Sequence, residues 1–292
     1  MPRAEPSVRV GVDVGGTFTD VCARDAAGRL RELKVPTTPE NPAIGVMNGV
    51  AALGLGARAL AAMAHGTTAV TNAIVEGRIA TVGLVTTRGF RDVLEIGRQN
   101  RAQLYELIAP GKPEALVPRR LRLEVAERVA VDGTVVQGLD PADVPALVER
   151  LREAGVDSVA VCLLHAYANP AHERQLREAL GRAFPHVSIS SDINAEFREY
   201  ERTATTVLNA AVMPLAARYV DELVGRLGAG FPLHLLHSAG GMMSAEAAKA
   251  RPLAMAMSGP AAGVAAAAWV AKRLGIDRAL AFDMGGTTTD VC

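Results

Sequence analysis

DVGGTFTDVC, at Asp13–Cys22, and DMGGTTTDVC, at Asp283–Cys292, are two nearly identical stretches of this 292-residue sequence. They agree at eight of ten positions, and each follows a short apolar run that predicts a β-strand. Two adjacent glycines let the backbone turn tightly and bring its N–H groups close to phosphate oxygens. One copy alone is explained equally well as a Gly-Gly hairpin turn, whereas a matched pair indicates two phosphate-binding hairpins.

The residue types within each copy suit a phosphate and its metal ion. The candidate phosphate-binding residues are Gly15, Gly16, Thr17, Gly285, Gly286 and Thr287. Asp13 and Asp283 are the candidate catalytic and metal-binding residues, because a carboxylate next to a polyphosphate would repel it unless Mg²⁺ stood between them. Asp20 and Asp290 close the motifs, and bonds to the N–H groups of their own turns explain them as well.

The rest of the chain alternates predicted strands and helices, which favours an α/β fold. Three local predictions are specific: a β-meander at Leu121–Val136, a short strand at Leu253–Met257, and a long helix over 196–227 that breaks or kinks at Pro214. The Ala-rich segment Ala261–Leu274 predicts a further helix.

Two glycine hairpins in separate lobes that face each other across a cleft resemble the arrangement of the actin/hexokinase/Hsp70 superfamily. Neither GxxxxGK[ST] nor a strand–helix GxGxxG occurs in the sequence. The resemblance implies a ribonuclease H-like (actin-like ATPase) first lobe with an inserted α/β subdomain, and a second lobe that is truncated. The helix at Ala261–Leu274 is similar to the helix that joins the lobes, although simple packing explains it equally well.

Composition excludes several classes of function. Hydrophobic residues make up 49% of the chain, and Lys+Arg and Asp+Glu both total 31, which argues against a nucleic-acid surface or a polybasic membrane patch. The longest apolar run, near Ala261–Ala271, is too short for a bilayer, and the N-terminus lacks a signal-peptide core. We therefore expect a cytoplasmic protein without nucleic acid or membrane partners. Three cysteines without CxxC spacing indicate neither a zinc site nor a disulfide framework.

Segments along nearly the whole chain resemble the hydantoinase A/5-oxoprolinase family, which includes ATP-dependent N-methylhydantoin and 5-oxoproline hydrolases and the acetone carboxylase β subunit. The matching segments are VGVDVGGTFTD (10–20), HGTTAVTNAIVEG (65–77), GLVTTRGFRDVLEIGRQNR (83–101), REYERTATTVLNAAVMP (198–214), SGPAAGV (258–264) and DMGGTTTDV (283–291). The resemblance implies an N-terminal family domain at 8–185 and the start of the ATPase domain at 203–292.

The resemblance also implies an activity. ATP, with Mg²⁺, would phosphorylate the carbonyl oxygen of a small cyclic amide of hydantoin or 5-oxoproline type, and water would then open the ring. Members of the family commonly work with a B-type subunit, so such a partner is expected. Two alternatives stay open: an acetone-carboxylase-type subunit that phosphorylates a ketone or bicarbonate, and a non-catalytic Hsp70-like nucleotide-binding module or inactive fragment.

On the substrate side, His65 is a candidate catalytic residue, and Thr67, Thr68 and Asn72 are candidate substrate-binding residues. They lie at a predicted strand-to-helix junction, where free N–H groups favour an oxyanion or a phosphate. A helix N-cap and a histidine with satisfied hydrogen bonds explain this segment nearly as well. Arg98 and Arg101 are further candidates for a substrate carboxylate or phosphate, although a solvated loop also explains them.

Family members continue for hundreds of residues beyond the position that matches the second motif. We therefore expect this chain to be a fragment, because one strand and a glycine turn cannot bury a sheet face alone. Such a fragment would bind ATP poorly and show no measurable turnover.

Overall fold

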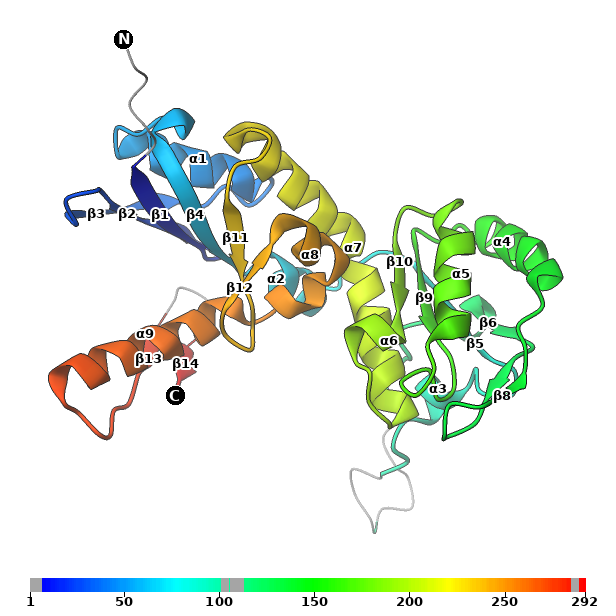
Figure 1. Ribbon diagram of the computed structural model, residues 1–292. Coiled ribbons are helices and arrows are strands. Elements are labelled where there is room, and N and C mark those ends of the chain that lie inside the picture. The colour runs from blue at the N-terminus through cyan, green and yellow to red at the C-terminus, as the bar shows by residue number, and fades with distance from the viewer. Residues whose placement is uncertain (1–6, 101–104, 106–112, 285–288) are drawn as a thin grey trace. The chain divides into compact units, whose positions relative to one another are not determined.

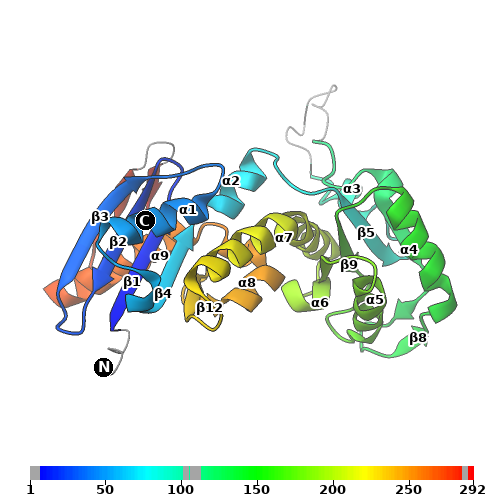
Figure 2. The ribbon, with the colours of Figure 1, turned by 90° about the horizontal axis from the view of Figure 1, so that it is seen from above.

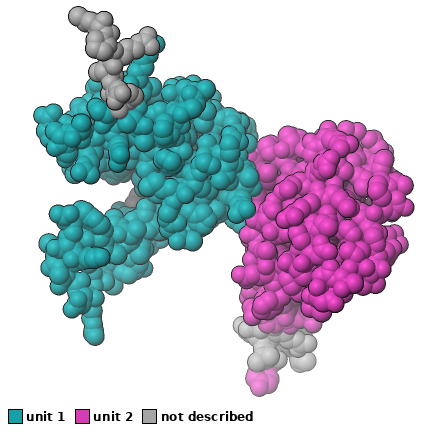
Figure 3. Space-filling view, in the orientation of Figure 1, with its two compact units in different colours: residues 1–78, 215–292 teal, residues 79–214 magenta. Residues whose placement is uncertain are grey.

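The structure, a computed structural model, describes residues 7–100, 105, 113–284 and 289–292 (Figure 1). It divides into two compact units: residues 1–78 with 215–292 form unit 1, and residues 79–214 form unit 2 (Figure 3). Unit 2 is thus inserted, along the sequence, between the two segments of unit 1. These units do not coincide with the sequence segments 8–185 and 203–292, because the first 78 residues pack with the C-terminal segment.

Unit 1 is built on a six-stranded mixed sheet with the order β12-β11-β4-β1-β2-β3. Its first three strands form an antiparallel meander, whereas β4 and β11 run parallel to β1. The bounds are β1 Val8–Val14, β2 Phe18–Arg24, β3 Leu30–Pro36, β4 Leu60–Thr67, β11 Leu233–Leu236 and β12 Met242–Ser244.

Strict alternation in β1 and β2 gives the sheet two different faces. In β1 the four valines are buried and the residues between them are exposed. Helix α1 (Pro42–Ala52) covers the buried face (Figure 2), and Gly49 on α1 lies against Val21 of β2. Asn41 caps the helix by accepting a hydrogen bond from the Ala43 N–H, and proline follows at the first helical position. The opposite face of the meander carries Asp13 and therefore faces the candidate site.

The remaining elements of unit 1 are mostly helical. They are η1 Ala57–Ala59, α2 Ala69–Val75, α8 Ala245–Ala250, η4 Pro252–Met255, α9 Ser258–Leu274, β13 Phe282–Met284 and β14 Thr289–Val291. The second glycine motif contributes β13 and β14, which pair antiparallel with Asp283 opposite Asp290. In the first motif Asp13 lies opposite Asp20 in the same way, so the two motifs form hairpins of matching register.

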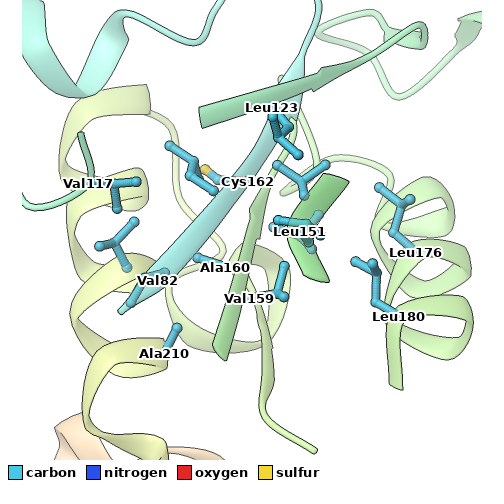
Figure 4. Packing of buried hydrophobic residues seen from close by; sticks show 14 of the residues in the cluster. Val82, Val117, Leu123, Leu151, Val159, Ala160, Cys162, Leu176, Leu180 and Ala210 are labelled. Atoms are coloured by element: carbon cyan, nitrogen blue, oxygen red, sulfur yellow. The ribbon is translucent and has the colours of Figure 1, made fainter. Parts of the chain in front are cut away.

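Unit 2 contains a four-stranded parallel sheet with the order β10-β9-β5-β6. Every residue of β5 and β9 is buried, as expected for central strands of a parallel sheet. Val82, Leu151, Val159, Leu176 and Leu180 belong to its core (Figure 4). Its elements are β5 Val82–Thr87, α3 Val93–Ile96, η2 Arg119–Leu121, β6 Arg122–Val125, β7 Arg128–Val129, β8 Val135–Gln137, η3 Pro141–Asp143, α4 Val144–Glu153, β9 Ser158–Cys162, α5 Ala171–Gly181, β10 Val187–Ile189 and α6 Ser190–Ile193.

Three local predictions need correction. The predicted meander at 121–136 is only partly present: β6 joins the parallel sheet, and only β7 and β8 form a hairpin. The predicted strand at Leu253–Met257 is instead the 3₁₀ turn η4, because Pro252 fixes a helical φ at its first position. The long helix α7 (Glu199–Leu227) continues through Pro214, the residue at which unit 2 ends, so the predicted break is absent, and a kink at Pro214 stays a prediction.

None of the helices within the described residues combines the length and the apolar character that a membrane crossing requires.

Candidate functional site

The first glycine motif forms a hairpin turn that is fixed by hydrogen bonds from within unit 1. The Gly15 N–H donates to the Phe18 carbonyl at 2.9 Å. A Cβ at Gly15 would lie 3.1 Å from that same carbonyl oxygen, so a side chain there would press against the turn. Thr37, which follows β3, donates its N–H to the Thr17 carbonyl and its hydroxyl to the Gly15 carbonyl, each at 2.9 Å. No motif in the sequence marks Thr37, which holds both sides of the turn.

Asp13 occupies a space that two glycines leave free. Gly66 lies opposite Asp13 on the neighbouring strand β4. A Cβ at Gly66 would stand 2.7 Å from the Asp13 Oδ1 atom, which is closer than real carbon–oxygen contacts allow. Gly259, in the first turn of α9, approaches the same oxygen, since its Cβ would lie 3.7 Å away. The end of β1, the end of β4 and the start of α9 therefore meet at this carboxylate.

The electrostatics of Asp13 favour a bound cation. Its pKa is raised, first because the surrounding protein displaces water and then because the carboxylates of Asp20 and Asp283 are near; Lys34 opposes the shift. A positive ion would relieve this accumulation of negative charge. Within the described residues, no group of three or more His, Cys, Asp or Glu side chains could hold a metal ion. Mg²⁺ fits such a site, because it commonly takes one or two carboxylates and completes its shell with water and phosphate oxygens.

A cavity of about 760 Å³ opens on the exposed face of the meander. Its lining includes Asp13, Asp20, Cys22, Glu32 and Lys34, all from β1, β2 and β3. Figure 3 shows unit 1 deeply hollowed between the body that holds the sheet and the arm formed by α9, β13 and β14. A volume of this size is within the range of small-molecule and cofactor sites.

The second motif is described only at its ends. Asp283 is exposed on β13, and its charge contributes to the raised pKa of Asp13. The candidate phosphate-binding residues Gly285, Gly286 and Thr287 lie outside the described residues.

His65 is fully buried at the carboxyl end of β4. Its Nε2 atom lies 2.5 Å from the Tyr219 hydroxyl of α7. Burial lowers the pKa of His65 to about 4, against a smaller opposing effect of the Val12 backbone, and burial raises the pKa of Tyr219. At neutral pH both groups are therefore uncharged, and a hydrogen bond joins the neutral imidazole to the protonated phenol. A side chain so enclosed does not fit direct contact with a substrate; the geometry fits a residue that fixes the end of β4 beside Asp13.

Thr67, Thr68 and Asn72 are brought together at the β4–α2 junction. The Thr67 hydroxyl accepts a hydrogen bond from the Ala69 N–H at 3.1 Å, which caps the start of α2. Thr68 donates its N–H and its hydroxyl to the Val14 carbonyl, at 3.0 and 3.1 Å, and Asn72 donates to the Thr68 hydroxyl at 3.3 Å. These side chains tie the junction to the residue that immediately precedes the glycine turn. They lie beside the first glycine turn, and their hydroxyls already have protein partners.

The arginine candidates belong to unit 2. Arg98 forms an ion pair with Glu201 at 2.5 Å, and Arg101 lies outside the described residues. Arg202, on α7, is buried, although arginine side chains usually lie on the surface of a helix. It donates to the Ser190 hydroxyl at 2.9 Å and lies over the Tyr167 ring. A helical pattern cannot distinguish this buried arginine from the partly exposed Glu199 and Glu201 beside it.

Comparison with known proteins places the chain in a family. The model of the hydantoinase/oxoprolinase N-terminal region matches residues 9–184, and the hydantoinase/oxoprolinase model matches residues 202–292. The chain belongs to the hydantoinase/oxoprolinase family. Its family relatives include the caprolactamase subunit alpha of Pseudomonas jessenii (35% identical, covering 97% of this chain and 43% of the relative), the acetone carboxylase beta subunit of Xanthobacter autotrophicus (30%, 97% and 42%) and 5-oxoprolinase 1 of Arabidopsis thaliana (28%, 98% and 25%).

Two solved structures of the hydantoinase/oxoprolinase family share this mixed α/β fold. The nucleotide-free structure of acetone carboxylase, an enzyme of ATP-dependent acetone carboxylation, matches with a TM-score of 0.84 and 28% identity over 98% of this chain and 44% of its own. The ATP-dependent caprolactamase from Pseudomonas jessenii matches with a TM-score of 0.82 and 34% identity over 97% and 43%. The chain therefore spans less than half the length of these relatives.

Proposed function

We propose that this chain is the N-terminal part of an ATP-dependent hydrolase that acts on cyclic amides. The observation that carries the proposal is the pair of matched hairpins, Asp13 opposite Asp20 and Asp283 opposite Asp290, within one unit that contains a large cavity. The strand order β11-β4-β1-β2-β3 supports a ribonuclease H-like (actin-like ATPase) first lobe. The caprolactamase relative, which is closer in identity than the acetone carboxylase subunit, supports a cyclic amide as the substrate.

The proposed chemistry answers a specific difficulty. An amide carbonyl is a poor electrophile, and transfer of a phosphoryl group from ATP to its oxygen would supply a good leaving group before water opens the ring. The protein's contribution to phosphoryl transfer is positioning and charge neutralisation. In this chain the backbone of Gly15, Gly16 and Thr17 would hold the phosphates. When bound, Mg²⁺ would neutralise phosphate charge, with Asp13 and Asp283 as its protein ligands.

The residues around the β4–α2 junction take a revised role in this proposal. His65, Thr67, Thr68 and Asn72 act as positioning residues: His65 bonds to Tyr219, Thr67 to the start of α2, Thr68 to Val14 of β1, and Asn72 to Thr68. They keep Asp13 and the glycine turn in register with β4. Contact of the substrate with Arg98 and Arg101 stays a prediction.

The second candidate is a subunit of acetone-carboxylase type that phosphorylates a ketone or bicarbonate. The TM-score of 0.84 with acetone carboxylase favours it. Relatives of both types are named as subunits, which supports a partner subunit for this protein, of B type in the hydrolase case.

The test is substrate-dependent ATP hydrolysis by the protein in its native assembly. With Mg²⁺ present, ATP hydrolysis should rise on addition of ε-caprolactam, 5-oxoproline or a hydantoin, and Asp13→Asn should abolish the rise. A rise with acetone and bicarbonate alone would support the carboxylase candidate. ATP binding without stimulation by any of these compounds would contradict both and leave a nucleotide-binding module.

A further inference from the structure

A row of charged side chains crosses the open face of the unit 1 sheet. Asp13, Asp20 and Lys34 lie directly opposite one another on the adjacent strands β1, β2 and β3. All three line the cavity. The Lys34 ammonium lies 2.9 Å from the Asp20 carboxylate and 5.5 Å above the ring of Phe18, the residue that follows the glycine turn. A long cationic side chain thus ends beside the proposed phosphate hairpin.

The charge balance of the cavity makes this lysine important. Asp13, Asp20 and Glu32 bring negative charge to the lining, whereas Lys34 alone brings positive charge among the lining residues that the structure describes. A polyphosphate adds further negative charge, and a metal ion balances only part of it. Lys34 already interacts with Asp13, because its positive charge lowers the pKa of Asp13. Burial and the neighbouring carboxylates act in the opposite direction and have the larger effect.

The existing partner of Lys34 can be exchanged at little cost. The side chains of Lys34 and Asp20 are 57% and 53% exposed, and ion pairs in such solvated positions typically contribute only about 0–1 kcal/mol. Phosphate oxygens bind an ammonium ion more strongly, through charge-assisted hydrogen bonds. The exposed setting also means that the fold does not depend on this pair.

We propose that Lys34 is a nucleotide-binding residue, whose ammonium leaves Asp20 and binds the polyphosphate when ATP enters the cavity. This inference rests on the proposed ATP site and adds a residue to it. It also gives Asp20 a role: the carboxylate holds the ammonium at the edge of the cavity until the nucleotide arrives.

Binding measurements test the inference without relying on turnover. Isothermal titration of the protein in its native assembly with a non-hydrolysable ATP analogue, with and without Mg²⁺, compares wild type with Lys34→Met and Lys34→Arg. Lys34→Met should weaken binding at least about tenfold in both conditions, the loss expected for one charge-assisted hydrogen bond. Lys34→Arg should restore most of the affinity. The dependence of the affinity on salt should become less steep in Lys34→Met.

A matched control is available in the same unit. Lys249 also forms an ion pair at 2.9 Å, with Asp221, and does not line the cavity. Lys249→Met should therefore bind the analogue like wild type. Equal affinities for wild type, Lys34→Met and Lys249→Met would overturn the inference while leaving the ATP site intact. Failure of the wild-type protein to bind the analogue would instead remove the proposed function, and this inference with it.

Discussion

Replacement of His65 by glutamine should reduce the pH dependence of the stability of unit 1. The imidazole is fully buried, and its pKa falls from 6.5 to about 4. Between these values the unfolded chain binds a proton that the folded chain excludes, so acid favours unfolding. The contribution of the neutral His65 imidazole to the stability of the folded state is fully present above pH 6.5 and is lost as the pH falls towards 4. At 1.36 kcal/mol for each pKa unit, the loss amounts to about 3 kcal/mol.

The assay is urea denaturation at a series of pH values between about 4 and 7, together with hydrogen-exchange protection of β1 and β4, which reports on unit 1 alone. Glutamine can still form a hydrogen bond with the Tyr219 hydroxyl but does not titrate. The free energies of unfolding of wild type and variant, plotted against pH, should therefore converge towards acid pH. Tyr219→Phe is the control: it loses the hydrogen bond, at a cost of about 1–3 kcal/mol, but keeps the titrating imidazole and hence the pH slope. Parallel pH curves for wild type and His65→Gln would refute the reasoning, as would an NMR titration of His65 with a midpoint near 6.5.

Three further outcomes are expected. Gly66→Ala should lower the rate of substrate-stimulated ATP hydrolysis about a hundredfold while circular dichroism stays unchanged, because the new Cβ would stand 2.7 Å from the Asp13 Oδ1 atom and small misplacements at reacting groups are costly. Gly49→Ala should lower the free energy of unfolding by about 1–2 kcal/mol in urea, since its Cβ would lie 2.4 Å from Val21; Gly263→Ala, with open space on α9, should raise it by up to about 1 kcal/mol. Binding of Mg·ATP should begin to weaken, as the pH falls, at a higher pH than an ordinary aspartate would give, because the pKa of Asp13 is raised; a midpoint at or below 3.8 contradicts this.

The glycine motifs could be predicted from the sequence because their geometry is local. A strand, two glycines and a second strand specify a hairpin within ten residues, and both hairpins pair in the register that the repeat indicates. What surrounds Asp13 could not be predicted in this way. Gly66 and Gly259 approach it from parts of the chain that are distant in sequence, and nothing in either segment specifies that contact.

The burial of individual side chains could not be predicted from the sequence. The place of His65 at a strand–helix junction predicts a catalytic role, whereas its burial involves Tyr219, which is 154 residues away along the chain. Arg202 shares its helix with exposed charged residues and is nevertheless enclosed by unit 2. Short apolar runs were ambiguous for a related reason: the segment that forms β6 suits a hairpin or a parallel strand equally, and only its neighbour β5 decides between them.

The insertion of unit 2 into unit 1 has a consequence for the order of events during synthesis. Residues 79–214 leave the ribosome as one uninterrupted segment, so unit 2 can close its core as soon as its last helix is made. The sheet of unit 1 cannot be completed at that stage, because β4 lacks its parallel neighbour β11 until Leu233–Leu236 has been translated. During that interval β4 presents an unpaired edge, which is a known template for association between chains. The slow, non-local step of folding therefore falls on the very strand that supplies Gly66 and His65 to the candidate site.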